Sequence, residues 1–200
     1  MDEKTIEFYN THADEFLKRT QDAEMHVLQN QFLERLPKDA SILDLGCGSG
    51  RDSLFFLHHG FHVTMVDASE AMCEAAEKLT GQKAVNGDFL SFTVNGKFDG
   101  VWACASLLHL HIDEIPLALI HLMPMLKDDA KLYLSFKYGE FEGELYDRYF
   151  TYLTEQRFIK LLKKTQSPNG TFELKEMFQS DDVRPGNETK WLNIFLQYRK

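Results

Sequence analysis

The sequence predicts an α/β fold in which helices cover both faces of a doubly wound, mostly parallel sheet. Short apolar runs typical of strands recur between residues 42 and 136, and helical patterns separate them. Two further strand-like runs near the C-terminus have no helix between them, which predicts an antiparallel pair there. The 200 residues are enough for one domain with a single buried core.

The first region, residues 4–35, carries apolar side chains at helical spacing, among them Ile6, Tyr9 and Ala13. Pro37 is expected to end this helical region because proline cannot continue a helix. Five strand-like runs follow, at Ile42–Leu45, His62–Val66, Ala84–Val85, Gly100–Cys104 and Lys131–Phe136.

Two of the intervening helices have recognisable ends. Ser69 is a suitable N-cap for a helix over residues 70–79, and Gly81 can end that helix in the left-handed conformation. Gly60 can end the helix that begins after Gly50 in the same way.

The last part of the chain breaks the alternation of strands and helices. Thr171–Met177 and Lys190–Tyr198 have the composition of strands, and residues 182–187 between them are typical of a loop. These two runs are therefore expected to pair as an antiparallel hairpin.

Composition narrows the class of partner. The formal net charge of −9 gives a polyanion no general reason to bind, so a small molecule is expected rather than nucleic acid. Three cysteines without a C-x-x-C pair, and a first segment unlike a signal peptide, indicate the cytoplasm. The most apolar stretch, residues 107–126, contains acidic residues and prolines, so no membrane span is expected. The eight histidines show no recognisable zinc spacing, and no metal is expected.

The loop after the first strand-like run is the most informative motif, because it contains Gly46, Gly48 and Gly50. Alternating glycines let backbone N–H groups approach a ligand, and the next helix directs its positive end to the same place. The dinucleotide pattern G-x-G-x-x-G needs its third glycine where Arg51 stands, so the loop departs from that pattern. Asp44 can accept hydrogen bonds from the loop amides and from an ammonium group. This combination suits a zwitterionic amino-acid tail better than a pyrophosphate.

A second acidic position, Asp67, ends a strand-like run about twenty residues after the glycine loop, where a carboxylate can accept both hydroxyls of a ribose. The alternatives are a solvated side chain or a cap for the helix after Ser69. The spacing from Gly46 favours the ribose role. An NAD enzyme would use such a carboxylate in the same way, so Asp67 does not distinguish the two cofactors.

These motifs resemble those of the class I S-adenosylmethionine-dependent methyltransferases, in which apolar residues, an acidic residue and one apolar residue precede G-x-G-x-G. The resemblance implies a Rossmann-like sheet of seven strands with an antiparallel last strand. It also implies that Asp88 and Phe89 read the adenine edge and that the Cys104 carbonyl contacts the methionine amino group. An ordinary turn at Gly87 and Asp88 remains the alternative. The implied cofactor-binding residues are Tyr9, Phe16, Asp44, Gly46, Cys47, Gly48, Gly50, Arg51, Asp67, Ala68, Met72, Asp88, Phe89 and Cys104.

Segments 8–10, 48–53, 137–140 and 191–193 resemble a small bacterial group related to the tellurite-resistance-type methyltransferases. In that group the N-terminal helix folds over the cofactor, which makes Tyr9 and Phe16 candidates for contacting it. The implied organisation is one domain over residues 1–200, as a monomer or homodimer. Its parts are a helical cap at 1–37, a cofactor-binding core at 38–136, and an acceptor-side lid with the terminal hairpin at 137–200.

The acceptor side is less determined by the sequence. Aligning an acceptor behind a sulfonium methyl can lower the barrier by about 7–11 kcal/mol. His109 is the best-placed general base, and a packed histidine that donates to a backbone carbonyl is the alternative. Tyr138 and Glu140 are the other candidates. They lie in segment 136–158, whose interleaved aromatic and acidic residues predict either a wall around a cationic or amine acceptor or a packed lid.

The leading hypothesis is transfer of a methyl group from S-adenosylmethionine to a small molecule, with S-adenosylhomocysteine as the product. A nicotinamide-dependent oxidoreductase is one alternative, disfavoured by Arg51 and by the pair Asp88 and Phe89. A module that binds S-adenosylmethionine without catalysis is the other.

Overall fold

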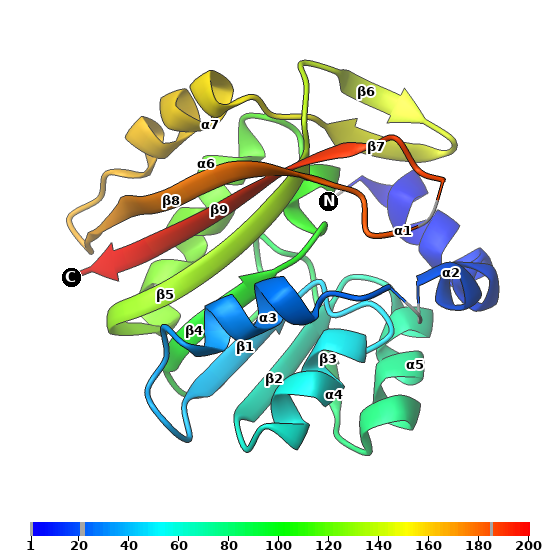
Figure 1. Ribbon diagram of the computed structural model, residues 1–200, viewed down its shortest axis with the longest axis horizontal. Helices are drawn as coiled ribbons and strands as arrows, with labels where there is room; N and C mark the ends of the chain where they lie inside the picture. The colour runs from blue at the N-terminus through cyan, green and yellow to red at the C-terminus, as the bar shows by residue number, and fades with distance from the viewer. Residues whose placement is uncertain (1, 21–22, 185) are drawn as a thin grey trace.

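The computed structural model describes residues 2–20, 23–184 and 186–200. Over these ranges seven strands form one sheet in the order β3-β2-β1-β4-β5-β9-β8, and β6 pairs with β7 in a separate hairpin (Figure 1). Within the large sheet only β9 runs against its neighbours. The predicted doubly wound, mostly parallel sheet with an antiparallel last strand is therefore confirmed.

Each predicted strand-like run coincides with a strand of the sheet. The strands are β1 Ser41–Leu45, β2 His62–Asp67, β3 Ala84–Asn86, β4 Phe98–Ala103, β5 Leu126–Lys137, β6 Glu142–Leu145, β7 Arg148–Thr151, β8 Thr171–Asp181 and β9 Lys190–Arg199. The α-helices are α1 Glu3–Thr11, α2 Ala13–Thr20, α3 His26–Leu33, α4 Arg51–His58, α5 Glu70–Thr80, α6 Glu114–Leu122 and α7 Glu155–Leu162. Three short 3-10 turns are η1 Leu107–His109, η2 Met123–Met125 and η3 Lys163–Thr165.

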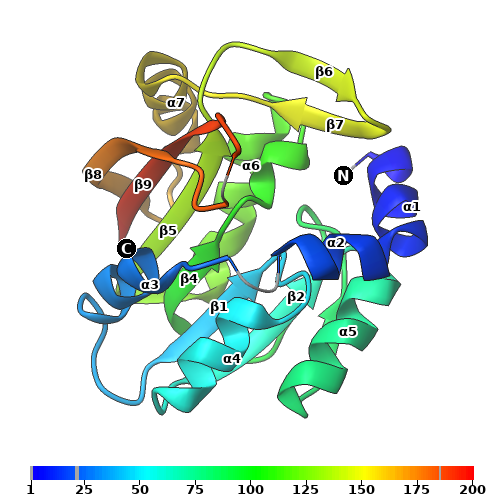
Figure 2. The same cartoon turned by 45° about the vertical axis from the view of Figure 1, so that its right-hand side comes forward.

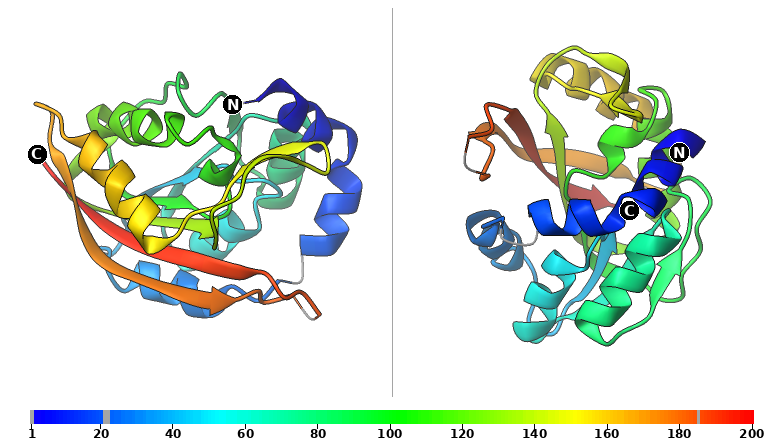
Figure 3. Two further views of the ribbon diagram at one scale, coloured as in Figure 1. Left: turned by 90° about the horizontal axis from the view of Figure 1, so that it is seen from above. Right: turned by 90° about the vertical axis from the view of Figure 1, so that its right-hand side faces the viewer.

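Helices cover both faces of the sheet because successive strand side chains point to opposite sides (Figure 3). In β1, Ile42 packs with Phe32 of α3 and Phe56 of α4. Its neighbour Leu43 belongs to the larger core cluster on the other face, which includes Leu119 of α6. The helix α3 falls within the expected cap of residues 1–37, yet it packs on the sheet rather than over its edge.

The predicted helix ends are also present. The Ser69 hydroxyl accepts a hydrogen bond from the Met72 amide at 3.2 Å, and Gly81 ends α5 with a φ of 73°. Gly60 follows α4 with a φ of 84°. Local capping chemistry was therefore readable without knowledge of the tertiary structure.

The hairpin of β6 and β7 is not predicted by the strand-like runs. Its two turn residues, Tyr146 and Asp147, have φ values of 53° and 58°, and neither is the glycine or asparagine that usually marks such a turn. Tertiary contact supports the hairpin instead, because the Tyr149 amide of β7 donates to the Thr5 hydroxyl of α1 at 2.8 Å. Figure 2 shows this hairpin above α1.

The helix α1 connects this hairpin to the opposite side of the molecule. The Asn10 side-chain oxygen of α1 accepts from the Ser69 hydroxyl, just before α5, at 2.7 Å. Together with the Thr5 contact, this holds α1 across the edge of the sheet where the parallel strands end. Across the parts of the chain that the structure describes, no helix combines the length and apolar character needed to cross a membrane.

Candidate functional site

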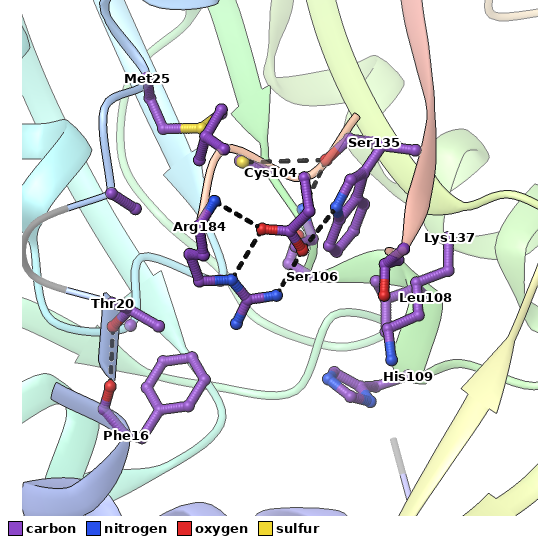
Figure 4. A pocket seen from close by; sticks show the side chains of 18 of the residues that line it. Phe16, Thr20, Met25, Cys104, Ser106, Leu108, His109, Ser135, Lys137 and Arg184 are labelled. Carbon is purple, nitrogen blue, oxygen red and sulfur yellow. Dashed lines mark hydrogen bonds and ion pairs between the residues drawn. The ribbon is translucent and has the colours of Figure 1, made fainter. Parts of the chain in front are cut away.

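A cavity of about 570 Å³ lies at the carboxyl ends of the parallel strands. The chain order reverses there, since β2 and β3 lie on one side of β1 and β4 and β5 on the other. Ligands of open α/β sheets bind at such a switch point. Figure 4 shows Phe16, Thr20 and Met25 on one side of the cavity and Leu108, His109 and Lys137 on the other.

The cavity brings together most of the residues expected to hold a cofactor. Those that line it are Tyr9, Phe16, Gly46, Gly48, Arg51, Asp67, Met72, Phe89 and Cys104. The expected residues outside the lining are Asp44, Cys47, Gly50, Ala68 and Asp88. On the acceptor side His109 lines the cavity, whereas Tyr138 and Glu140 do not.

The glycine loop packs tightly beneath the cavity. Gly46 and Gly48 have φ values of 78° and 51°, which is the left-handed region. The amides of Gly46 and Cys47 both donate to the Val66 carbonyl, at 2.8 and 3.0 Å. A Cβ at Gly46 would lie 2.3 Å from the Ser106 Cβ, so only glycine fits there.

Asp67 orders both the loop and the start of α5. Its Oδ2 accepts from the Gly48 amide at 2.8 Å, and its Oδ1 accepts from the Ser69 amide at 2.9 Å. Burial raises the pKa of Asp67, and these two amides oppose the shift. The hydrogen bond to the Ser69 amide fits the alternative in which Asp67 caps the helix after Ser69. The Asp67 carboxylate also lines the cavity, as the ribose role requires.

Asp44 has a different partner from the one expected. Its carboxylate is buried and accepts from the Ser53 hydroxyl of α4 at 2.6 Å. The loop amides donate to the Val66 carbonyl and to Asp67 instead, so the expected bonding of Asp44 to those amides is wrong. Burial, and secondarily the nearby Asp52, raises the pKa of Asp44 to about 8. The physical reason is the direction of the side chain, which β1 places under α4 rather than toward the cavity.

The buried carboxylate of Asp52 accepts hydrogen bonds from three side chains, and the sequence did not indicate this role. Arg51 binds it through Nε at 2.8 Å and Nη2 at 3.0 Å. Gln29 of α3 and Trp102 of β4 each donate to it at 2.8 Å. The remaining Arg51 nitrogen, Nη1, donates to the Thr20 carbonyl at 3.0 Å, which joins α2 to the same group. An adjacent Arg-Asp pair at a helix start was the only local signal, and it does not reveal the distant partners.

His109 takes part in a buried chain of hydrogen bonds. Its Nδ1 lies 2.7 Å from the Tyr149 carbonyl, and its Nε2 lies 2.9 Å from the Tyr9 hydroxyl. A carbonyl only accepts, so Nδ1 carries the proton and Nε2 accepts from Tyr9. Burial lowers the pKa of His109 to about 3. The geometry matches the packed histidine that donates to a backbone carbonyl.

We expect His109 to stay neutral between pH 5 and 8, as the lowered pKa requires. In the unfolded chain the same imidazole takes up a proton below pH ~6.5, whereas in the folded protein it stays neutral down to a pH of about 3. The free energy of unfolding therefore decreases by about 1.4 kcal/mol for each pH unit below ~6.5. Imidazole ¹⁵N–¹H correlation spectra, assigned with His109→Gln, measure both the tautomer and the titration. A midpoint near pH 6 would contradict the assignment.

Asp88 and Phe89 occupy a turn with distinct roles for the two side chains. The Asp88 carboxylate accepts from the Leu90 amide at 2.8 Å, as in an ordinary turn. Phe89 is buried, lines the cavity and would contact a Cβ at Gly46 through its ring at 3.2 Å. The turn alternative therefore fits the carboxylate, while the aromatic ring forms part of the wall.

Tyr138 lies outside the cavity because of strand alternation. Lys137, at the end of β5, lines the cavity, and the next side chain of an extended segment points the other way. The Tyr138 amide donates to the Lys190 carbonyl at 2.8 Å, and Glu140 is exposed. Lys137 was not among the expected site residues, although its place at a strand end was a usable signal.

The sheet order, the glycine loop and the switch-point cavity define an α/β protein of the nucleotide-cofactor type. Residues 42–129 match the sequence profile of a family described as "Methyltransferase domain". This stretch is similar to that family, and the chain has the fold of solved S-adenosylmethionine-dependent methyltransferases. The narrower grouping with tellurite-resistance-type enzymes stays a prediction.

Individual relatives agree with the family but extend beyond this chain. A ubiquinone biosynthesis O-methyltransferase of Coxiella burnetii is 26% identical over 159 residues, covering 77% of this chain and 62% of that protein. The 1,6-didemethyltoxoflavin-N1-methyltransferase of Burkholderia thailandensis, crystallised with S-adenosylhomocysteine, has a TM-score of 0.76 at 22% identity, covering 98% of this chain and 85% of that one. The chain spans roughly half to three-fifths of the curated relatives it matches first.

The fold by itself does not decide the reaction. A structure described as a putative zinc-dependent alcohol dehydrogenase of Rhodobacter sphaeroides has a TM-score of 0.77 at 13% identity, covering 100% of both chains. One fold supports many chemistries, so the function has to be argued from the residues of the site. Among the residues placed by the structure, no three histidine, cysteine or acidic side chains gather as metal ligands would.

Proposed function

We propose that the protein binds S-adenosylmethionine in this cavity and transfers its methyl group to a small molecule, leaving S-adenosylhomocysteine. The observation that carries the proposal is the convergence of Gly48, Asp67, Phe89 and Cys104 on one cavity at the switch point. The names of the Coxiella and Burkholderia proteins support it. The net charge of −9 supports a small acceptor rather than nucleic acid, and we propose a cytoplasmic monomer or homodimer.

The residues present fit such a cofactor. A Cβ added at Gly48 would meet nothing within 4 Å, so this part of the loop backbone is open on the cavity side. Asp67 offers an anionic acceptor for ribose hydroxyls, and Met72 and Phe89 offer apolar surface for an adenine ring. The Ser106 hydroxyl is buried at the cavity and has no hydrogen-bond partner in the described chain. Within the expected cap of residues 1–37 we propose that α1 and α2 cover the cofactor, while residues 38–136 form the cofactor core and 137–200 the acceptor side.

When bound, S-adenosylmethionine supplies an electrophilic methyl group, so the protein's main task is to orient the acceptor and exclude water. Tyr9 and Phe16 close the cavity from the N-terminal side. A proton taken up by His109 would have to reach Nε2, where the Tyr9 hydroxyl now donates. Burial lowers the pKa of His109 to about 3, so this uptake is disfavoured and the acceptor is expected to arrive without a proton to lose.

The experiment is calorimetry with S-adenosylmethionine, S-adenosylhomocysteine and NADH. We expect the first two to bind and NADH to bind far more weakly. Preferential binding of NADH would favour the oxidoreductase alternative. Methyl release measured over a panel of metabolites then separates the enzyme from a non-catalytic binding module.

Replacing Asp67 tests the ribose assignment. We expect Asp67→Ala to weaken S-adenosylhomocysteine binding about 10- to 150-fold, since losing a charged hydrogen-bond acceptor removes about 1.5–3 kcal/mol. Calorimetry measures the affinity, and a thermal melt without ligand shows whether the variant is folded. Asp113→Ala, at an exposed acid that is not part of the cavity lining, is the control. Equal affinity of the two variants would refute the role of Asp67.

A further inference from the structure

The acceptor end of the cavity is built around one aromatic ring. Phe150 of β7 is buried, and the Lys137 Nζ lies 4.3 Å from its ring centroid. The Arg148 Cζ lies 5.1 Å from the same centroid, and the His109 ring lies 4.8 Å away. Lysine, arginine and histidine side chains therefore surround a single apolar surface, and all three line the cavity.

The two cations of this group have no acidic partner. Among the residues that the structure describes, neither Lys137 nor Arg148 forms an ion pair, and each donates a side-chain hydrogen bond only to a hydroxyl. Both also lie over aromatic rings, with the Arg148 Cζ 4.3 Å from the Phe8 ring centroid. Lys137 donates to the Tyr152 hydroxyl at 3.3 Å, and Arg148 donates to the Tyr9 hydroxyl at 3.5 Å. The Arg148 Nε is buried without a hydrogen-bond partner. Partly buried cations without a counter-charge destabilise the empty site, and a bound anion would offset that.

The carboxylates that line the same cavity are already engaged. Asp52 is bound by Arg51, and Asp182 is bound by Arg184 through two nitrogens. Asp67 is bound by two backbone amides. Asp181, the fourth acid of the lining, pairs with Lys190. None of these four carboxylates forms an ion pair with Lys137 or Arg148, and Asp182 acts on Lys137 only through its charge, against the opposing charges of Arg148 and Arg184.

The acidic residues of segment 136–158 do not reach the cavity. Glu142 binds Arg157 and the Tyr149 hydroxyl, Glu144 binds Lys4, and both acids are exposed. The cavity lining contains none of Glu140, Glu142, Glu144 and Asp147. Of the two alternatives for this segment, the lid with its acids facing solvent fits these four exposed side chains, and the wall of carboxylates around a cationic acceptor does not.

We propose that the methyl acceptor is an organic anion, a planar carboxylate, held by Lys137 and Arg148 beside the ring of Phe150. The Ser106 hydroxyl, which lacks a partner, supplies a further donor at the cavity. This proposal rests on the proposed function, because it names the substrate class of the same site. In Figure 4, Lys137 and His109 lie together on the side opposite Phe16.

The test compares three probes with one ring and different charge: benzoate, benzamide and benzylamine. Each is titrated by calorimetry into protein saturated with S-adenosylhomocysteine. We expect benzoate to bind at least about tenfold more tightly than benzamide, and benzylamine not to bind, with benzoate affinity falling as salt is raised. Tighter binding of benzylamine, equal binding of benzoate and benzamide, or no binding of benzoate overturns the proposal.

Variants locate the probe in the structure. Lys137→Met and Arg148→Met are each expected to weaken benzoate binding about tenfold or more, while Lys137→Arg retains most of it. Lys164→Met, at an exposed lysine paired with Asp113, is the matched control. Unchanged benzoate affinity in both methionine variants places the anion elsewhere and overturns the proposal. S-adenosylhomocysteine binding by each variant is measured first, so that loss of the cofactor site is distinguished from loss of the acceptor site.

Discussion

Replacing Gly46 by alanine is expected to lower the free energy of unfolding by about 2 to 5 kcal/mol. A left-handed conformation destabilises a residue with a Cβ by about 1–2 kcal/mol, and overpacking adds about 1–3 kcal/mol. Both contributions apply, since Gly46 has a φ of 78° and its added Cβ would lie 2.3 Å from the Ser106 Cβ. Urea unfolding measures the change.

Gly48→Ala is the control for the steric part of this effect. Gly48 also has a positive φ, 51°, but an added Cβ would meet nothing within 4 Å. We expect a loss of about 1–2 kcal/mol from conformation alone. Equal losses for the two variants would show that the contact with Ser106 relaxes freely, which would contradict the close packing of the loop.

Replacing Asp52 by alanine is expected to destabilise the protein by about 3 kcal/mol, because breaking a buried ion pair leaves a charge without compensation. The change removes the partner of the Arg51 guanidinium and the acceptor of the Trp102 and Gln29 donors. The estimate lies at the low end of the usual range because the Arg51 side chain is 26% exposed. Chemical unfolding monitored by circular dichroism measures the loss.

Asp113→Ala removes an exposed carboxylate and serves as the comparison. Asp113 pairs with Lys164 at 3.0 Å, but the two side chains are 83% and 57% exposed. Such a pair contributes less than about 1 kcal/mol. Similar destabilisation by the two substitutions would contradict a stabilising role for the buried contacts of Asp52 with Arg51, Trp102 and Gln29.

The sequence predicted the elements that depend on local chemistry. Gly81 ends α5 and the two C-terminal runs form a hairpin, because caps and strand patterns act over a few residues. The hairpin at Tyr146 and Asp147 was missed for the opposite reason. Its turn lacks the usual residues, and the contact with Thr5 supports it from 144 positions away.

The site divides in the same way. Gly46, Asp67 and Phe89 are recognisable from motifs, and the structure gathers them at one cavity. Hydrogen-bond partners that depend on long-range packing could not be predicted from the sequence, as the Gln29 and Trp102 donors to Asp52 show. Tyr138 was an acceptor-side candidate, whereas its neighbour Lys137 lines the cavity, because the side of an extended strand that faces a cavity depends on register.

The attachment of α1 also fixes when the site is completed during synthesis of the chain. A helix of 9 residues is not stable alone, so α1 waits for its partners although it is made first. Asn10 needs Ser69, which follows 59 residues later, and Thr5 needs Tyr149, which follows after 144. The cavity therefore gains the wall that α1 supplies only after residue 149 has left the ribosome.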